Sequence, residues 1–255
     1  FIEAGTVTAR AQPGNPKPRV FRLPGQKGLI NRFGFNNDGA DAVAQRLADL
    51  KKSGLWPDIP VGINLGKSKV TPIEEATGDY LLSFERLQHF GDYFVLNVSS
   101  PNTPNLRKLQ DGAALGDLFS HMQRRNTAHK PLLVKIAPDI DWESIEEILA
   151  LVKENEIAGI IATNTTIDHA AIDPALQQQG GLSGAPLRQR STEIVKFITS
   201  KTDTPVIAVG GIMDADDALE KFDAGAALVQ LYTGYIYRGP GLITEICDRL
   251  LARGT

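Results

Sequence analysis

A regular alternation of short apolar segments with longer amphipathic segments constrains the fold of this chain more than any other feature of its sequence. The short apolar segments predict β-strands at residues 1–8, 60–65, 93–97, 132–136, 159–163, 205–209 and 227–231. Apolar residues at helical spacing predict a helix after each strand, at residues 39–52, 79–90, 113–124, 142–155, 186–200, 214–222 and 241–252. Strict alternation of this kind predicts a parallel sheet covered by helices.

Polar residues and glycines at the strand ends distinguish the two parallel architectures. A doubly wound sheet concentrates its site at one switch point, whereas a closed barrel gathers residues from many strand ends at one mouth. Nearly every predicted strand here ends in such a residue: Thr6, Asn64, Asn97, Lys135, Asn164, Gly211 and Thr233. We therefore expect an α/β fold of the TIM-type (β/α)8 barrel. Only seven βα units are visible, so either the first strand is missing or the sheet is open.

Composition excludes several classes of function. The 255 residues, 42% of them hydrophobic, are enough to bury the core of a single barrel domain. A net charge of -3 without a basic run argues against a nucleic-acid surface. The single cysteine, Cys247, rules out a disulfide framework and a cysteine-ligated metal, and we predict no metal site. We expect Cys247 to be a core residue of the last helix.

The segment at residues 93–105 joins an apolar strand to a loop dense in serine, asparagine and proline. An α/β protein usually keeps its chemistry at such a strand end, so we expect a functional loop here. The structural alternative is a connection in which Ser100 or Asn102 caps the next helix. We interpret two further segments, residues 28–37 and 180–184, as loops.

Glycines follow the last two predicted strands, in Gly210-Gly211 and Thr233-Gly234. Backbone N–H groups beside helix N-termini are how barrels hold a phosphate, which predicts a phosphorylated cofactor or substrate. The alternative for both pairs is close packing of a strand against a helix.

Six segments, in this order, resemble the class 2 dihydroorotate dehydrogenases of the bacterial type. They are residues 30–36 (INRFGFN), 97–103 (NVSSPNT), 134–139 (VKIAPD), 162–166 (ATNTT), 180–184 (GGLSG) and 209–212 (VGGI). The resemblance implies an FMN-dependent barrel that oxidises dihydroorotate to orotate in pyrimidine (UMP) biosynthesis and passes the electrons to a membrane quinone. The assignment to class 2 depends on the serine at position 100, because class 1 enzymes have a similar motif with cysteine at that position.

The resemblance implies a role for each matching residue. Ser100 is implied as the catalytic base that removes the C5 proton of the substrate. The implied substrate-binding residues are Asn31, Arg32, Phe33, Gly34, Phe35, Asn97, Asn102, Asn164 and Thr165. The implied FMN-binding residues are Thr6, Asn64, Asn97, Lys135, Thr163, Gly184, Gly211, Tyr232 and Thr233.

One departure from the family pattern concerns the start of the chain. The family has an Ala-Ala-Gly-x-Asp-Lys loop after its first strand, preceded by a helical extension that binds quinone and membrane, and neither is visible here. We therefore expect residues 1–255 to be a single, N-terminally truncated FMN-binding domain. Peripheral contact with the cytoplasmic side of the inner membrane, and most of the quinone site, are expected in the missing segment, and the fragment alone is expected to be soluble.

Two other functions remain open from the residues themselves. Lys135 at a strand end also fits a Schiff-base aldolase of the same fold. A truncated, inactive barrel that acts as a binding module is the non-enzymatic alternative. A serine base cannot be deduced from the residues alone, because none of the four histidines lies in these motifs to activate it.

Overall fold

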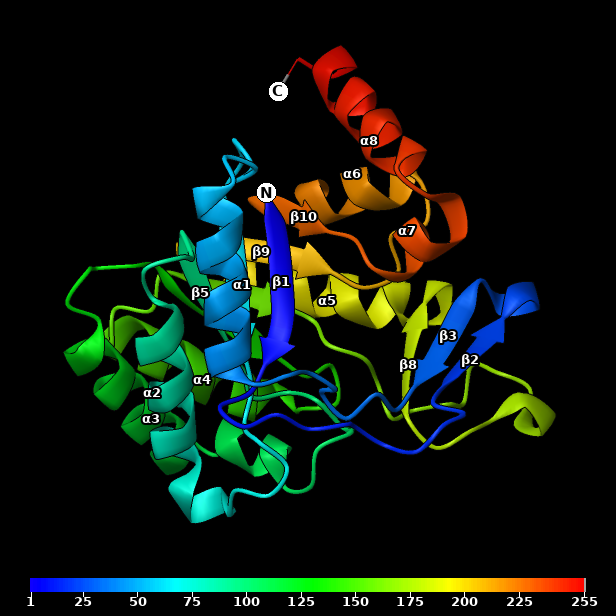
Figure 1. Ribbon diagram of the computed structural model, residues 1–255. Helices are drawn as coiled ribbons and strands as arrows, with labels where there is room; N and C mark the ends of the chain where they lie inside the picture. The colour runs from blue at the N-terminus through cyan, green and yellow to red at the C-terminus, as the bar shows by residue number, and fades with distance from the viewer. Residues whose placement is uncertain (255) are drawn as a thin grey trace. The chain divides into compact units, whose positions relative to one another are not determined.

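The structure is a computed structural model that describes residues 1–254 (Figure 1). Its backbone contacts divide the chain into two compact units. The first unit contains residues 1–16, 33–135 and 142–159, and the second contains residues 17–32, 136–141 and those from 160 onward. Each strand and helix lies within one unit, except that Ile136 and Gly159, the end residues of two parallel strands, fall on the other side of the division.

The first unit contains the first four parallel strands, which pair in the order of the chain. They are β1 (Ile2–Val7), β4 (Val61–Leu65), β5 (Tyr93–Asn97) and β6 (Leu132–Ile136). In this register Asn64 is paired with Gly5, and Asn97 is paired with Lys135. The carboxyl ends of four strands therefore lie along one edge, which brings together residues far apart in the sequence.

Four helices accompany these strands, and each packs against the next along the chain (Figure 1). They are α1 (Ala40–Lys52), α2 (Ala76–Leu87), α3 (Gly112–Arg125) and α4 (Trp142–Glu154). Their apolar faces follow helical spacing: α4, for example, buries Ile145, Ile148, Leu149 and Val152. Two single-turn helices, η2 (Ile73–Glu75) and η3 (Leu106–Gln110), follow the ends of β4 and β5.

The second unit contains three further parallel strands in chain order, β7 (Gly159–Ala162), β9 (Val206–Val209) and β10 (Leu228–Gln230). Its helices are α5 (Arg188–Thr199), α6 (Ala215–Asp223), α7 (Thr233–Arg238) and α8 (Gly241–Ala252). Ile212, Ala215, Ala218, Leu242 and Ile246 form an apolar cluster that includes residues of both α6 and α8. The predicted strands and helices agree with the observed ones to within three residues at each end.

A second, antiparallel sheet in this unit contradicts the expectation that residues 28–37 and 180–184 are wholly loop (Figure 1). It consists of β2 (Val20–Leu23), β3 (Gly28–Asn31) and β8 (Gly181–Gly184), with η1 (Pro24–Gln26) connecting the first two. Each strand has four residues, and β3 and β8 contain glycine, so their sequences lack a clear alternation. The partner of β3 lies about 150 residues away, and only tertiary structure reveals that pairing.

The sequence also did not predict three smaller elements of the second unit: α7, η4 (Pro174–Leu176) and η5 (Ala185–Leu187). The expectation for Cys247 was wrong, because its side chain is exposed. Helix α8 buries Leu242 and Ile246, and the residue after Ile246 is rotated by about 100° away from that face. Among residues 1–254 no helix is long and apolar enough to cross a membrane.

Candidate active site

A hydrogen-bonded cluster of Thr6, Asn64 and Asn97, in which the two asparagines are buried, lies at the strand ends of the first unit. We call these three residues the amide cluster. The hydroxyl of Thr6 donates to Oδ1 of Asn64 at 2.7 Å. The Nδ2 of Asn97 donates to that same oxygen at 3.1 Å and to Oγ1 of Thr6 at 3.2 Å. Three of the residues predicted to contact FMN are therefore in mutual contact.

A buried ion pair extends the amide cluster. Nζ of Lys135 lies 4.0 Å from Oε1 of Glu3, and their side chains are only 15% and 10% exposed. The same Glu3 oxygen accepts a hydrogen bond of 2.9 Å from Nδ2 of Asn64. Lys135 was predicted from the sequence, whereas Glu3 was missed. The available signal was that Glu3 is the only charged residue of β1.

Ser99 and Ser100, at the start of the loop after β5, are buried. Oγ of Ser99 donates to Oδ1 of Asn97 at 3.1 Å, so the loop is tied to the amide cluster. Oγ of Ser100 accepts the backbone N–H of Asn102 at 3.3 Å. The serine thus closes a local turn, and helix η3 begins only after Asn105 without a side-chain cap. The alternative of a helix cap at Ser100 or Asn102 does not hold.

The same loop contains a buried hydroxyl that the protein leaves without a partner. Oγ1 of Thr103 has no hydrogen-bond partner among the described residues, although the residue is only 4% exposed. Burying an unpaired hydroxyl is unfavourable, so such an atom points to a ligand or water as its missing partner. Residues 98–105 include no acid, histidine or lysine that could act as the base in place of Ser100.

The segment Phe33-Gly34-Phe35 is held in place by residues of the loop that follows β1. Gly34 has a φ of 72°, and a Cβ there would lie 2.8 Å from Nδ2 of Asn15. That nitrogen also donates to the carbonyl of Asn102 at 3.4 Å. Asn15 therefore lies beside two segments that the sequence analysis assigned to substrate binding.

In the second unit, the residues predicted to hold FMN form close packing contacts. Oγ1 of Thr233 donates to Oγ of Ser183 at 2.9 Å, and Ser183 donates in turn to the carbonyl of Leu29 at 3.2 Å. Gly184, at a φ of 90°, approaches Thr233 so closely that a Cβ would overlap its neighbours. Tyr232, the next predicted contact, is 55% exposed.

The glycine pairs show the close packing that was the alternative to a phosphate site. A Cβ on Gly211, which has a φ of 79°, would overlap the backbone of Arg188. A Cβ on Gly234 would overlap the carbonyl of Ile212. Packing accounts for these two glycines, and phosphate binding stays a prediction.

The residues after β7 include a second buried hydroxyl without a partner. Oγ1 of Thr163 has none among the described residues, and Thr163 is 2% exposed. Its backbone N–H donates to the carbonyl of Val209 at 2.7 Å, which fixes the residue at the end of the strand. Oδ1 of Asn164 accepts the N–H of Thr165 at 2.8 Å. Thr163 thus has a free hydrogen-bonding group suited to a ligand.

Asn31 ends β3, where it pairs with Gly181. The side chain of Arg32 contacts other residues of the second unit, and its role in substrate binding stays a prediction. Its guanidinium donates to the carbonyl of Pro18 at 2.9 and 3.2 Å and lies over the ring of Phe21. These contacts engage the side chain at the surface of the second unit.

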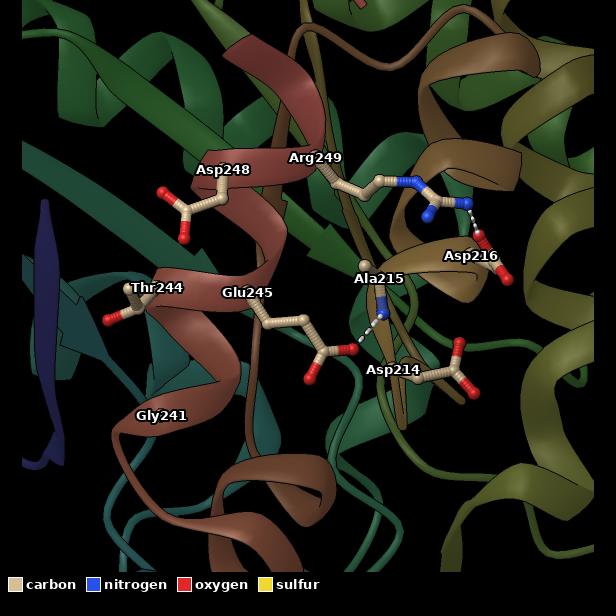
Figure 2. A pocket seen from close by; sticks show the side chains of 8 residues that line it. All are labelled: Asp214, Ala215, Asp216, Gly241, Thr244, Glu245, Asp248 and Arg249. Atoms are coloured by element: carbon tan, nitrogen blue, oxygen red, sulfur yellow. Dashed lines mark hydrogen bonds and ion pairs between the residues drawn. The ribbon is translucent and has the colours of Figure 1, made fainter. Parts of the chain in front are cut away.

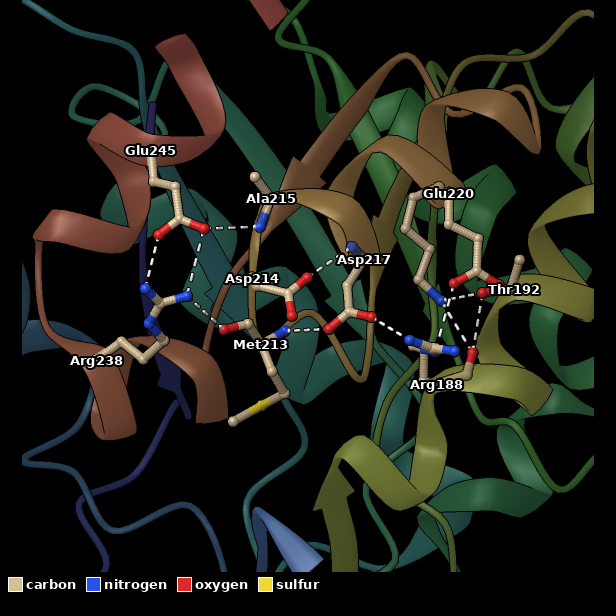
Figure 3. Close-up of polar contacts among 10 residues, drawn as sticks. Arg188, Thr192, Met213, Asp214, Ala215, Asp217, Glu220, Arg238 and Glu245 are labelled. Atoms are coloured by element: carbon tan, nitrogen blue, oxygen red, sulfur yellow. Dashed lines mark hydrogen bonds and ion pairs between the residues drawn. The ribbon is translucent and has the colours of Figure 1, made fainter. Parts of the chain in front are cut away.

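Charged groups of the second unit form a separate network around α6 (Figure 3). The carboxylate of Asp217, which is 5% exposed, pairs with Arg188 and accepts the N–H of Met213 at 2.9 Å. Lys221 is fully buried, and this burial lowers the pKa of its amine to about 8. This network braces α5 against α6 and contains no residue predicted for the site.

An open pocket between α6 and α8 also lies apart from the predicted residues (Figure 2). Its lining is largely acidic and includes Asp214, Glu245 and Asp248. Arg249 pairs with Asp216 at 2.6 Å across it. Among residues 1–254 no group of acidic, histidine or cysteine side chains is arranged to hold a metal ion.

Comparison with known proteins identifies the family. The family model described as dihydroorotate dehydrogenase matches residues 1–253. The "Dihydroorotate dehydrogenase (quinone)" of Gloeobacter violaceus is 56% identical over 255 residues, covering 99% of this chain and 71% of that protein. The protein of the same name from Trichormus variabilis is 54% identical, covering 99% of this chain and 69% of its own length.

A solved structure shows the same fold. The crystal structure of ligand-free dihydroorotate dehydrogenase from Eimeria tenella superimposes with a TM-score of 0.91 at 36% identity, covering 99% of this chain and 77% of that one. The expected α/β fold, a parallel sheet of the TIM-barrel type covered by helices, is therefore confirmed. These matches show that the chain belongs to the dihydroorotate dehydrogenase family, in its quinone-dependent class 2.

Proposed function

We propose that this chain oxidises (S)-dihydroorotate to orotate in pyrimidine biosynthesis, with FMN as the first electron acceptor and a quinone as the second. The family match over residues 1–253 makes the chain a dihydroorotate dehydrogenase, an oxidoreductase. The site assignment rests on the amide cluster, whose two asparagines are buried and which adjoins both Lys135 and the serine loop.

The residues present fit a flavin. A cofactor with several carbonyl and ring-nitrogen groups needs fixed donors and acceptors, and the amide cluster offers both. The ammonium of Lys135, in the same unit, provides positive charge. In the second unit, the unpartnered hydroxyl of Thr163 is a separate group suited to a ligand. When bound, FMN supplies the acceptor for the hydride that leaves C6 of the substrate.

The proposed FMN-binding residues form a separate set in each unit. The first set is Thr6, Asn64, Asn97 and Lys135, and the second is Thr163, Gly184, Gly211, Tyr232 and Thr233. In the second set the backbone of Gly211 and the first turn of α7, which begins at Thr233, are proposed to hold the phosphate.

Ser100 is proposed to take the proton from C5 of dihydroorotate. Its hydroxyl is 6% exposed and is held in a turn by the N–H of Asn102, so its position is fixed. An ordinary serine is a poor base at neutral pH, so the proton must move on through a neighbouring group. The buried, unpartnered hydroxyl of Thr103 in the same loop is suited to hold a water for that transfer.

Carboxamides suit the pyrimidine because each offers one donor and one acceptor to a ring with alternating N–H and C=O groups. The proposed substrate-binding residues are Asn31, Phe33, Gly34, Phe35, Asn97, Asn102, Asn164 and Thr165. Asn15, which contacts both Gly34 and Asn102, supports this set in the first unit. Arg32 is the weakest member of the predicted set, because its guanidinium is engaged with Pro18.

A quinone acceptor requires the protein to contact the membrane, because quinones dissolve there. We propose that the protein reaches it peripherally, at the cytoplasmic face of the inner membrane. We also propose that residues 1–255 form a single domain.

The test is to purify the chain, record its flavin spectrum and add dihydroorotate without oxygen. We expect a yellow protein that bleaches on addition of dihydroorotate and regains its colour with a soluble quinone. A colourless protein that forms an imine trapped by borohydride would support the Schiff-base aldolase instead. Folded protein with neither property would be a binding module. The family match favours the dehydrogenase over both.

A further inference from the structure

Glu3 is a buried carboxylate that the proposed reaction does not yet use. Its side chain is 10% exposed, and its partners include the amide of Asn64 and the ammonium of Lys135. A carboxylate withdrawn from water is unfavourable unless hydrogen bonds and opposite charge compensate it. Both compensating groups here belong to the proposed FMN-binding set.

The carboxylate determines which way the amide cluster points. An ionised carboxylate only accepts hydrogen bonds, so Asn64 must turn its NH₂ group toward Glu3. The opposite end of that amide, Oδ1, then faces the donors of Thr6 and Asn97. With its NH₂ group used in this way, Asn97 turns its own Oδ1 toward the hydroxyl of Ser99. One acceptor therefore sets the direction of the hydrogen bonds that connect Glu3 to Ser99 through Asn64 and Asn97.

Glu3 also limits the positive charge that Lys135 presents. A carboxylate 4.0 Å from an ammonium offsets part of its field in surroundings from which water is mostly excluded. A group that gains negative charge beside Lys135 is stabilised less than it would be by an unpaired lysine.

We propose that Glu3 is a positioning residue for the flavin reaction, which orients the amides of Asn64 and Asn97 and sets the charge that Lys135 presents to the flavin. This inference rests on the proposed function, because it presupposes that a flavin binds beside Lys135. It adds a residue that neither the sequence motifs nor the glycine loops indicated.

The test is the midpoint potential of the flavin in Glu3→Gln. Glutamine keeps the size of the side chain and an acceptor for Asn64, but it removes the charge. Without that charge the reduced flavin is stabilised relative to the oxidised flavin, so we expect the potential to move in the positive direction. The matched control is Glu85→Gln, which removes a carboxylate whose partner is Arg125 in a partly exposed pair at 3.3 Å. The control is expected to keep the parent potential.

Flavin content and the melting temperature of the apoprotein are measured on the same samples. A purely structural role for Glu3 would lower both and leave the potential of the retained flavin unchanged, and that result overturns the inference. Glu3→Asp keeps the charge but withdraws it by one methylene, so its potential should lie between those of the parent and Glu3→Gln. If Glu3→Gln does not fold, Glu3→Asp decides, and an unchanged potential again overturns the inference.

Measurements on the parent protein distinguish failure of the inference about Glu3 from failure of the proposed function. If the parent binds no flavin, the proposed function fails and the role of Glu3 fails with it. If the parent binds flavin and bleaches with dihydroorotate while Glu3→Gln keeps the parent potential, only the role of Glu3 is wrong.

Discussion

The hydroxyl of Tyr80, on helix α2, donates a 2.8 Å hydrogen bond to the backbone carbonyl of Asn97 at the end of β5. Tyr80 is fully buried, and burial raises the pKa of its phenol well above the usual range, so it stays a neutral donor. The bond ties a helix of the outer layer to the residue that links the amide cluster to the serine loop.

We expect Tyr80→Phe to destabilise the protein by about 1–3 kcal/mol, because the buried carbonyl of Asn97 loses its tyrosine donor. Urea unfolding of the parent and the variant measures the difference. Tyr235→Phe is the control, since Tyr235 is 44% exposed and the same change there should have little effect. Equal losses in the two variants would show that the bond to Asn97 contributes nothing particular to stability.

Removing the hydroxyl of Ser100 should abolish the chemical step and spare binding. We expect Ser100→Ala to retain FMN and bind orotate, while flavin reduction by dihydroorotate slows by roughly two to four orders of magnitude. Anaerobic stopped-flow absorbance measures that rate. Ser100→Cys should recover part of it, with a pH dependence moved toward the lower pKa of a thiol. Reduction of Ser100→Ala at the parent rate would leave the loop as a turn without a catalytic role.

Gly211 is the glycine whose replacement tests the proposed phosphate loop. At a φ of 79° and against the backbone of Arg188, it has no room for a side chain, so the loop must move in Gly211→Ala. We expect weaker FMN binding, seen as a lower ratio of flavin to protein and a higher Kd for added FMN. Gly78→Ala on α2 is the control, because nothing lies near a Cβ there. Full flavin content in folded Gly211→Ala would move the phosphate elsewhere.

Lys221 predicts a pH dependence of stability. Burial lowers the pKa of its amine from 10.5 to about 8, while Glu220 and Asp217 oppose that shift. Between pH 8 and 10.5 the folded protein therefore binds fewer protons at this site than the unfolded chain, so this contribution to stability rises with pH. Below about pH 8, the cost of burying the charged amine lowers the free energy of unfolding by its full amount. This cost falls by roughly 3 kcal/mol as the pH rises to 10.5.

Urea unfolding at pH 7.5 and 10 in the parent and in Lys221→Met measures this contribution. The stability of the parent relative to the variant should increase between the two pH values, because methionine does not titrate. Lys196→Met, at an exposed position of the neighbouring helix α5, is the control and should show no such change. A constant difference between the parent and Lys221→Met would mean that the buried amine does not change its charge in this range.

The sequence alone determined the periodic part of this protein. Parallel strands and their helices are visible in local periodicity. Among residues 1–254, the seven parallel strands and seven of the eight α-helices were therefore predicted to within three residues. The residue types at the strand ends and the motif around Ser100 likewise pointed to the family. These features depend on neighbours in the chain, which is why one sequence suffices to read them.

Tertiary structure decided the features that depend on residues distant in the sequence. The pairing of β3 with β8 joins segments without alternation, and the packing of Gly211 depends on Arg188. The partnership of Glu3 with Asn64 and Lys135 spans most of the first unit. An acidic residue in a strand looks like any solvated charge until parallel pairing places an amide and an ammonium beside it, because burial and opposite charge are properties of the folded chain.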